Sequence, residues 1–532
     1  MSELRRVGTV LGALALSVAV AVSTPFATLS PTGHYAVATA LFAAVLWVTE
    51  ALPLPVTALC VPVLLTVFGV SPTLGGALAP FADPVVFLLL AGFVLAAALS
   101  NHGIDRRIAY RLVARVGTSP RRLVLALMVA TAVLSMLISN TATTAMMIPV
   151  ALGVARSATG AAPAGSEPAS VATDGAGSAV GVDTDPDGRT DEPTNMETAA
   201  LLGTAYAASI GGVGTIIGTP PNAIVVSQLS ARLGYEISFA EWLLIGLPVV
   251  AVSLPVAWYL LAVRLYPPEV ADVSNAREHA RTALQSLGPV TPVGRRVVAI
   301  VGATAGLWLL GGFDFLFESL LAPTVYTTLF GGEGPSVFGV GHQGVLYFVV
   351  VGLAAIPALF LAGGIDWDDV TGIDWGTLLL LGGGLSLADA LATTDAVAWL
   401  ADTVLGPLVG VPIVVLVFVI VVTTILAGEL ASNTAMAAVL APLLIDVGPR
   451  YADALGTTGD TAAVLLAVTG AVAASFGFAL PVATPPNAIA FGTGHVGREQ
   501  MLRAGSVLDV ALAVVVTAVL LGLFAVVWPL VA

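Results

Sequence analysis

Long apolar stretches separated by short polar segments recur along the chain from residue 7 to residue 530. Each is about 17 to 25 residues long, the length that a helix needs to cross a ~30 Å hydrocarbon core. The first follows Arg5 and Arg6 like a signal peptide, but the many later spans favour an uncleaved first helix. The pattern predicts an all-α polytopic membrane protein, whose first four spans cover residues 7–24, 35–50, 54–70 and 83–100.

Two polar motifs interrupt these apolar stretches, and each occurs twice. Ser-Asn-Thr stands in "LISNTATTAMMIPVA" (137–151) and in "LASNTAMAAVLAPLL" (430–444). Further along come "ASIGGVGTIIGTPPNAI" (208–224) and "ASFGFALPVATPPNAI" (474–489). Two different motifs in the same order indicate an internal duplication, with repeats at 35–264 and 296–530.

Arginine placement predicts the orientation of the repeats. Six arginines lie between residues 106 and 122 and five between residues 264 and 296, whereas the segment 314–343 has none. The positive-inside rule puts both arginine-rich loops in the cytoplasm. Both loops can lie in the cytoplasm only if residues 121–157 do not cross the membrane but form a re-entrant hairpin that returns to the cytoplasm. Residues 411–447 repeat this hairpin from outside.

The predicted architecture therefore has about eleven transmembrane helices and two re-entrant hairpins in two inverted repeats. The N-terminus lies in the cytoplasm and the C-terminus outside. Residues 1–34 hold the first helix, and residues 265–295 form a cytoplasmic linker. Residues 158–196 are rich in Ala, Gly, Ser, Pro and Asp, which predicts a disordered cytoplasmic loop.

Irregular backbone at membrane depth is tolerated only where it is buried in protein or lines a wet cavity. The hairpin tips should therefore face a binding site, with free N–H groups and polar side chains for an anion and free carbonyls for Na+. No arginine or histidine lies in these segments, so cations must neutralise the anion. The threonine before each Pro-Pro pair is expected to cap the helix that begins there. We expect the substrate to contact both triplets and these two threonines: Ser139, Asn140, Thr141, Ser432, Asn433, Thr434, Thr219 and Thr484.

Composition narrows the function classes. The chain is 57% hydrophobic and carries a net charge of −14, and all 19 basic residues are arginine, which fits adaptation to a salty cytoplasm and excludes a nucleic-acid surface. Cys60 is a lone cysteine, and the five histidines show no metal-ligand spacing. No organic cofactor is expected. Glu50 and Glu429 are the acidic residues nearest the apolar regions. Two interpretations stay open for them: a residue that couples ion binding to transport, or a helix cap or ion-pair partner.

The chain resembles the divalent anion/sodium symporter family of INDY-like dicarboxylate, citrate and sulfate transporters. The resemblance rests on the two triplets, "WVTEALPLP" (47–55), "LGGGL" (381–385) and "ATPPNAI" (483–489). It implies a homodimer that works as an elevator, and two Na+ sites. The first is built from Ser135, Ser139, Asn140 and a carbonyl near Gly211, and the second from Gly428, Ala431, Asn433 and a carbonyl near Gly477. Family members often have threonine at Gly428, so a side-chain contact there would be lost.

The leading hypothesis is Na+-coupled symport of a small dianion, most plausibly a C4-dicarboxylate, across the cell membrane. A dicarboxylate exchanger and a sulfate or citrate transporter of the same family are the alternatives. An ion channel is disfavoured because paired re-entrant breaks suit an occluded site better than a continuous pore. A membrane enzyme is disfavoured because no nucleophile with a base, and no paired catalytic acids, lies in any segment.

Overall fold

The computed structural model describes residues 3–23, 29–115, 119–159, 194–332, 334, 336–337, 339, 343–404 and 410–526. Within these ranges, eight helices are long and apolar enough to cross a membrane, and four more apolar helices have 10–17 residues. The prediction of an all-α polytopic membrane protein is confirmed. The number of eleven spans and the orientation of the chain stay predictions.

Four helices match the predicted N-terminal spans. Polar caps begin two of them: Ser30 accepts a hydrogen bond from Gly33 N at the start of α2, and Asp83 accepts one from Val85 N at the start of α5. A short helix α4 and a 3-10 turn η1 connect α3 to α5. The bounds are α1 Glu3–Val22, α2 Pro31–Thr49, α3 Leu54–Val67, α4 Leu74–Leu78, η1 Ala79–Ala82 and α5 Pro84–Asn101.

Both predicted hairpins are pairs of helices joined by a tip of four residues. The first consists of α7 (Pro120–Ser135) and α8 (Asn140–Thr159), and the second of α19 (Ile413–Gly428) and α20 (Asn433–Val447). Helix α8 continues to Thr159, and α9 begins at Asn195, so most of the loop predicted to be disordered lies outside the described residues.

The second pair of motifs interrupts two helices. Seven residues separate α9 (Asn195–Gly212) from α10 (Pro220–Leu233), and ten residues separate α22 (Gly459–Ala474) from α23 (Pro485–Gly492). Each second segment begins with two prolines, whose missing N–H groups cost nothing in a first turn. The sequence therefore places the break in each helix.

The remaining helices complete the chain around these elements. A polar helix, α6, follows α5, and a π-helical turn, η2, extends α11. The bounds are α6 Ile104–Arg115, α11 Phe239–Tyr259, η2 Leu260–Leu265, α12 Ser274–Ser286, α13 Pro292–Gly311, η3 Asp314–Leu316, α14 Pro323–Phe330, α15 Phe348–Leu361, α16 Trp367–Thr371, α17 Trp375–Thr393, α18 Ala396–Val404, η5 Gly448–Tyr451, α21 Ala452–Leu455 and α24 Arg498–Val526.

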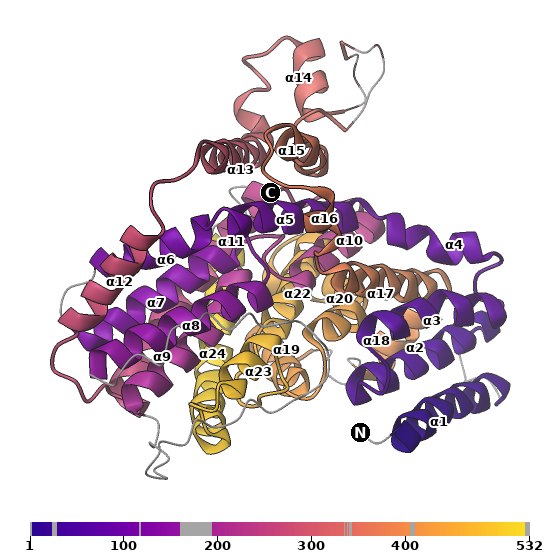
Figure 1. Cartoon of the computed structure of the whole chain (residues 1–532). Coiled ribbons are helices and arrows are strands. Elements are labelled where there is room, and N and C mark those ends of the chain that lie inside the picture. The colour runs from indigo at the N-terminus through magenta and orange to yellow at the C-terminus, as the bar shows by residue number, and fades with distance from the viewer. Residues whose placement is uncertain are drawn as a thin grey trace.

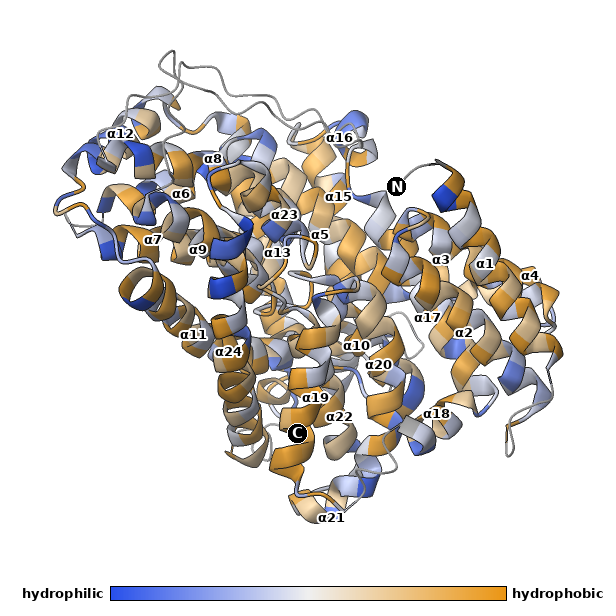
Figure 2. Ribbon diagram, turned by 90° about the horizontal axis from the view of Figure 1, so that it is seen from below, coloured by the Kyte–Doolittle hydropathy of each residue, from blue (hydrophilic) through white to orange (hydrophobic). Residues whose placement is uncertain are grey.

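The two halves of the chain are interleaved. Helix α10, from the first half, packs against α20 and α22 of the second, and α23 packs reciprocally against α8 and α9 (Figure 1). Helix α17 packs closely on α3, where a Cβ on Gly383 would overlap Ala58. Apolar residues cover most helices, while hydrophilic ones gather on α6 and α12 (Figure 2). The reciprocal packing brings both breaks into one protein interior.

Candidate functional site

The tip of the first hairpin lies against the break between α9 and α10. The Oγ of Ser135, the last residue of α7, lies 2.6 Å from Asn140 Oδ1 and 2.8 Å from Ala208 O. The Thr215 hydroxyl, in the break, donates to Met136 O in the tip. These contacts join the hairpin tip to α9 and to the break that follows it.

Asn140 lies in a cluster of oxygen atoms. Its Oδ1 faces Ser135 Oγ and the carbonyls of Ala208 and Gly218, and the single Ser135 hydroxyl cannot donate to all of them. With the amide turned over, Nδ2 would donate to these carbonyls over 3.0 and 3.3 Å. A cation held among the oxygens would favour the first orientation, and its absence the second. This donor set fits Na+.

The nearby carbonyls differ in detail from the expectation. The sequence pointed to a carbonyl near Gly211, and the carbonyls beside Asn140 belong to Ala208 and Gly218. Gly211 instead packs on the backbone of Ala132, where a Cβ would overlap it. A Cβ on Gly212 would overlap the Asn140 amide. The two glycines therefore let α9 approach the hairpin closely.

The asparagine of each "TPPN" motif holds its break together. Asn222 Nδ2 donates to Gly212 O at 3.0 Å and to Thr215 O at 2.8 Å. Asn487 Nδ2 donates to Gly477 O and Leu480 O, both at 3.0 Å. Both side chains are fully buried. In each half, the asparagine side chain thus donates hydrogen bonds to free carbonyls of the broken helix.

Glu429 joins the second hairpin to the second break. This residue lies at the tip, is 6% exposed, and accepts hydrogen bonds from Ala479 N at 2.9 Å and Leu480 N at 2.7 Å. A carboxylate bonded to two backbone N–H groups is a strong, charge-assisted contact. In the first half Met136 stands at the equivalent position, three residues before the triplet, so the two tips differ in charge.

Asp509, on α24, completes this contact and was missed by the sequence analysis. It is 7% exposed, accepts a hydrogen bond from Phe478 N at 3.2 Å, and lies beside Glu429. Tyr206 of α9 donates to Phe478 O at 2.8 Å. An ionisable residue inside an apolar helix of 29 residues was the available signal.

Unpaired oxygens lie beside the second tip. Asn433 Oδ1 is buried without a hydrogen-bond partner. The side of Gly428 where a Cβ would stand faces Phe476 O and Asn433 Oδ1, at 3.4 and 3.6 Å from that position. The carbonyl expected near Gly477 is therefore best matched by that of Phe476. Oxygen atoms without donors around a glycine fit a small hard cation such as Na+, with Gly428 providing space rather than a side-chain ligand.

The other predicted residues differ in exposure and capping. Ser139 accepts from Ala142 N at 3.3 Å, and Thr484 accepts from Asn487 N at 3.3 Å. Ser432 and Thr219 occupy N-cap positions but make no capping hydrogen bond, so the expectation that Thr219 caps its helix through its side chain is wrong. Thr141 is exposed at the first tip, whereas Thr434 is 9% exposed. Ala431 lies half-buried in the second tip.

Glu50 lies away from these contacts. It ends α2 in the left-handed conformation, with φ 48°, and its side chain is exposed. The interpretation as a helix-terminal residue fits this position better than a coupling role.

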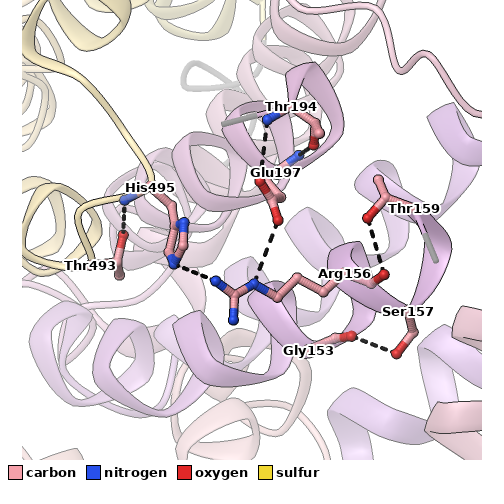
Figure 3. Close-up of polar contacts among 8 residues, drawn as sticks. All are labelled: Gly153, Arg156, Ser157, Thr159, Thr194, Glu197, Thr493 and His495. Atoms are coloured by element: carbon pink, nitrogen blue, oxygen red, sulfur yellow. Dashed lines mark hydrogen bonds and ion pairs between the residues drawn. The ribbon is translucent and has the colours of Figure 1, made fainter. Parts of the chain in front are cut away.

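A second polar cluster ties the ends of α8, α9 and α23 together (Figure 3). Arg156 Nη2 lies 2.9 Å from His495 Nε2, and Arg156 Nε lies 3.6 Å from Glu197 Oε1. Burial lowers the pKa of His495, and the Arg156 charge lowers it further, against an opposing effect of Glu197. The neutral ring accepts a hydrogen bond from Arg156, so this contact depends on an unprotonated His495.

The cluster predicts a pH dependence of stability. Because the pKa of His495 is lower in the folded than in the unfolded protein, the unfolded state takes up the proton first, and stability falls as the pH drops below about 6.5. His495→Gln keeps an acceptor for Arg156 and cannot titrate. Between pH 8 and pH 5, wild-type protein in detergent should lose a few degrees more in thermal midpoint than the variant. Equal losses would contradict the assignment.

Apolar spans, two polar hairpin tips and two broken helices together define a multi-pass membrane transporter. The chain belongs to the sodium:sulfate symporter family, whose transmembrane-region model matches residues 7–532. The family predicted from the motifs is thus confirmed.

The chain is similar to two sodium-dependent dicarboxylate transporters and to one solved transporter structure. The sodium-dependent dicarboxylate transporter SdcS of Staphylococcus saprophyticus is 31% identical over 502 residues, covering 94% of this chain and 87% of that one. SdcS of Staphylococcus aureus strain USA300 is 30% identical over 487 residues, covering 91% and 84%. The YdaH transporter of Alcanivorax borkumensis has a similar fold, with a TM-score of 0.52, 15% identity and 99% coverage of both chains.

Proposed function

We propose that the protein is a secondary active transporter that couples Na+ to the uptake of a small divalent anion, a C4-dicarboxylate, across the cell membrane. The oxygen cluster around Asn140 carries this proposal: it offers a cation site at the tip of a hairpin whose outgoing helix can receive an anion. The dicarboxylate specificity of the two SdcS relatives favours this substrate class over sulfate or citrate.

The charges around the tips explain why anion and cation bind together. The segments 135–141, 208–222, 428–434 and 474–487 contain no Arg, Lys or His, and Glu429 is their one acidic residue. Helix ends and neutral amides stabilise a dianion only partly, so bound Na+ supplies the missing positive charge. Each ion then raises the affinity for the other.

The two Na+ sites are proposed from residues at the two tips. Ser135, Asn140, Ala208 O and Gly218 O form the first, with Ser139 beside it. Asn433 and Phe476 O form the second, beside Gly428, Ala431 and Gly477. The substrate is proposed to bind between the tips, against Thr141 and Thr434 and the threonines of the two breaks.

The rest of the mechanism follows from the same architecture. The two halves, 35–264 and 296–530, are proposed to be inverted repeats with re-entrant hairpins, and the N-terminus is placed in the cytoplasm. The unit containing both tips would move as an elevator against a scaffold in a homodimer. Interleaved packing of α10 and α23 supports a single unit that carries both tips.

Uptake into proteoliposomes tests the proposal. Radiolabelled succinate should accumulate with an inward Na+ gradient and not with K+ or choline. Asn140→Ala and Asn433→Ala should each reduce uptake at least tenfold, because each removes an oxygen from a proposed Na+ site, a loss of about 1.4 kcal/mol or more. Reconstituted Glu278→Gln is the matched control, because Glu278 is 70% exposed on α12.

Three results would contradict parts of the proposal. If both asparagine variants took up succinate at the wild-type rate, the proposed Na+ sites would be wrong. Counterflow of succinate without Na+ would favour an exchanger, and single-channel currents would favour a channel. Sulfate uptake in place of succinate would keep the mechanism and change the substrate.

A further inference from the structure

Three arginines from two helices line a cavity at one end of the apolar span α13. Arg107 and Arg111 belong to α6, and Arg295 belongs to the first turn of α13. The cavity has a volume of about 300 Å³. Its remaining walls are apolar: Ile104, Ile108, Val290 and Val298.

Cationic and apolar side chains share one face of α6. Ile104, Arg107, Ile108 and Arg111 are spaced at i, i+3, i+4 and i+7, which places them side by side on a helix. A helix that only covers a protein surface turns its charges away from its apolar stripe. Here both kinds of side chain surround the same space, as an amphipathic ligand would require.

Arg107 holds the walls of the cavity in place. Only 7% exposed, it donates from Nη1 to Gly288 O and from Nη2 to Leu287 O, both at 2.6 Å. These bonds hold the segment between α12 and α13 against α6, and so fix Val290. The Nε of Arg107 is buried without a hydrogen-bond partner, which leaves a donor of this cavity-lining residue unused.

Arg111 and Arg295 are exposed, and in the described part of the chain neither takes part in an ion pair. Arg295 stands three residues into a 20-residue apolar span, and Val298, one turn further, is 44% exposed. An exposed valine on a span faces acyl chains, so the arginine one turn earlier lies near the level of lipid headgroups. Hydrophilic residues gather around α6 (Figure 2).

We propose that this cavity binds an anionic phospholipid, with the headgroup phosphate held by Arg111 and Arg295 and an acyl chain lying along Val298. Guanidinium groups match phosphate oxygens in pairs, and basic pockets beside membrane helices bind anionic lipid headgroups. The whole chain carries a net charge of −14, so the cluster of three arginines is a local exception that an anion complements.

Native mass spectrometry of the purified full-length protein tests the site, with phosphatidylglycerol and phosphatidylcholine as probes. Each exposed arginine near a lipid phosphate contributes about a fivefold gain in affinity. Arg111→Gln and Arg295→Gln should therefore each weaken phosphatidylglycerol binding about fivefold, and phosphatidylcholine binding should stay unchanged. Arg106→Gln is the matched control, because Arg106 is exposed on α6 outside the cavity.

The same experiment separates the alternatives. Equal losses in Arg106→Gln and Arg111→Gln would show that general surface charge, not this cavity, attracts the lipid. Equal retention of both lipids by wild type would also overturn the proposal. Glycerol phosphate or inorganic phosphate that competes as well as phosphatidylglycerol would identify a soluble anion site instead. Arg111→Lys keeps the charge but loses the paired donors, so its loss of binding should be smaller than that of Arg111→Gln but measurable. Thermal midpoints equal to that of wild type exclude misfolding as the cause of a loss.

Discussion

Replacing Glu429 by alanine is expected to abolish transport, with at least a hundredfold loss in the rate of Na+-driven uptake. The carboxylate accepts hydrogen bonds from Ala479 N and Leu480 N, both buried in the break after α22. Alanine leaves these two N–H groups without an acceptor, at about 1–3 kcal/mol each. The break then loses its connection to the second hairpin tip. Initial uptake rates in proteoliposomes at saturating Na+ measure the loss.

Two further variants show whether charge or hydrogen bonding matters at this position. Glu429→Gln keeps one carbonyl oxygen but turns an NH₂ group toward the other backbone donor, so an intermediate loss of about tenfold is expected, at 1–2 kcal/mol. Asp509→Asn keeps an acceptor for Phe478 N, so its loss should be smaller than that of Glu429→Ala. If Glu429→Ala matched wild type while folding normally, the tip and break would not be coupled through this residue.

A Na+ titration shows whether Glu429 positions the break beside the second Na+ site or only stabilises the structure in general. Glu429 touches the break, whose neighbouring Phe476 O lies by the proposed second Na+ site. Glu429→Gln should therefore raise the Na+ concentration for half-maximal uptake more than it raises the KM for succinate. An unchanged Na+ dependence with a lower maximal rate would indicate a purely structural role.

The sequence predicted the elements of the site better than their contacts. Proline pairs, the Ser-Asn-Thr triplets and the lengths of the apolar runs fix where helices begin and stop, because these signals are local. Helices accordingly begin at or next to both triplets and at both Pro-Pro pairs, as expected, while the re-entrant course of the hairpins stays a prediction. The expected side-chain cap by Thr219 is not formed, since a side chain at an N-cap position also has to adopt the rotamer that reaches the first free N–H groups.

Contacts between segments far apart in the chain were not predictable in this way. Asp509 lies 80 residues after Glu429, and the repeat gave no signal for it because the first tip carries Met136 instead of an acid. Likewise, the carbonyls of Ala208 and Gly218 reach Asn140 only because α9 packs tightly on the hairpin. Periodicity shows which face of a helix is buried but not which neighbour covers it.

Replacing Gly212 by alanine tests this tight packing and is expected to reduce Na+-driven uptake about thirtyfold. The new methyl group would overlap the amide of Asn140, on the facing hairpin. Either α9 moves away from the tip or the amide leaves the oxygen cluster, at a cost of about 2 kcal/mol. Because both outcomes disturb the proposed first Na+ site, the apparent Na+ affinity should fall together with the rate.

Gly492→Ala is the matched control for this substitution. Gly492 ends α23, in the other broken helix, and a Cβ there meets no atom within 4 Å. The control should transport like wild type and be at least as stable, since alanine favours helix over glycine by about 1 kcal/mol. A normal Na+ dependence in Gly212→Ala would show that the space beside Asn140 is not needed for the cation. A loss in both variants would instead point to a requirement for flexible broken helices, because the methyl group of the control touches nothing.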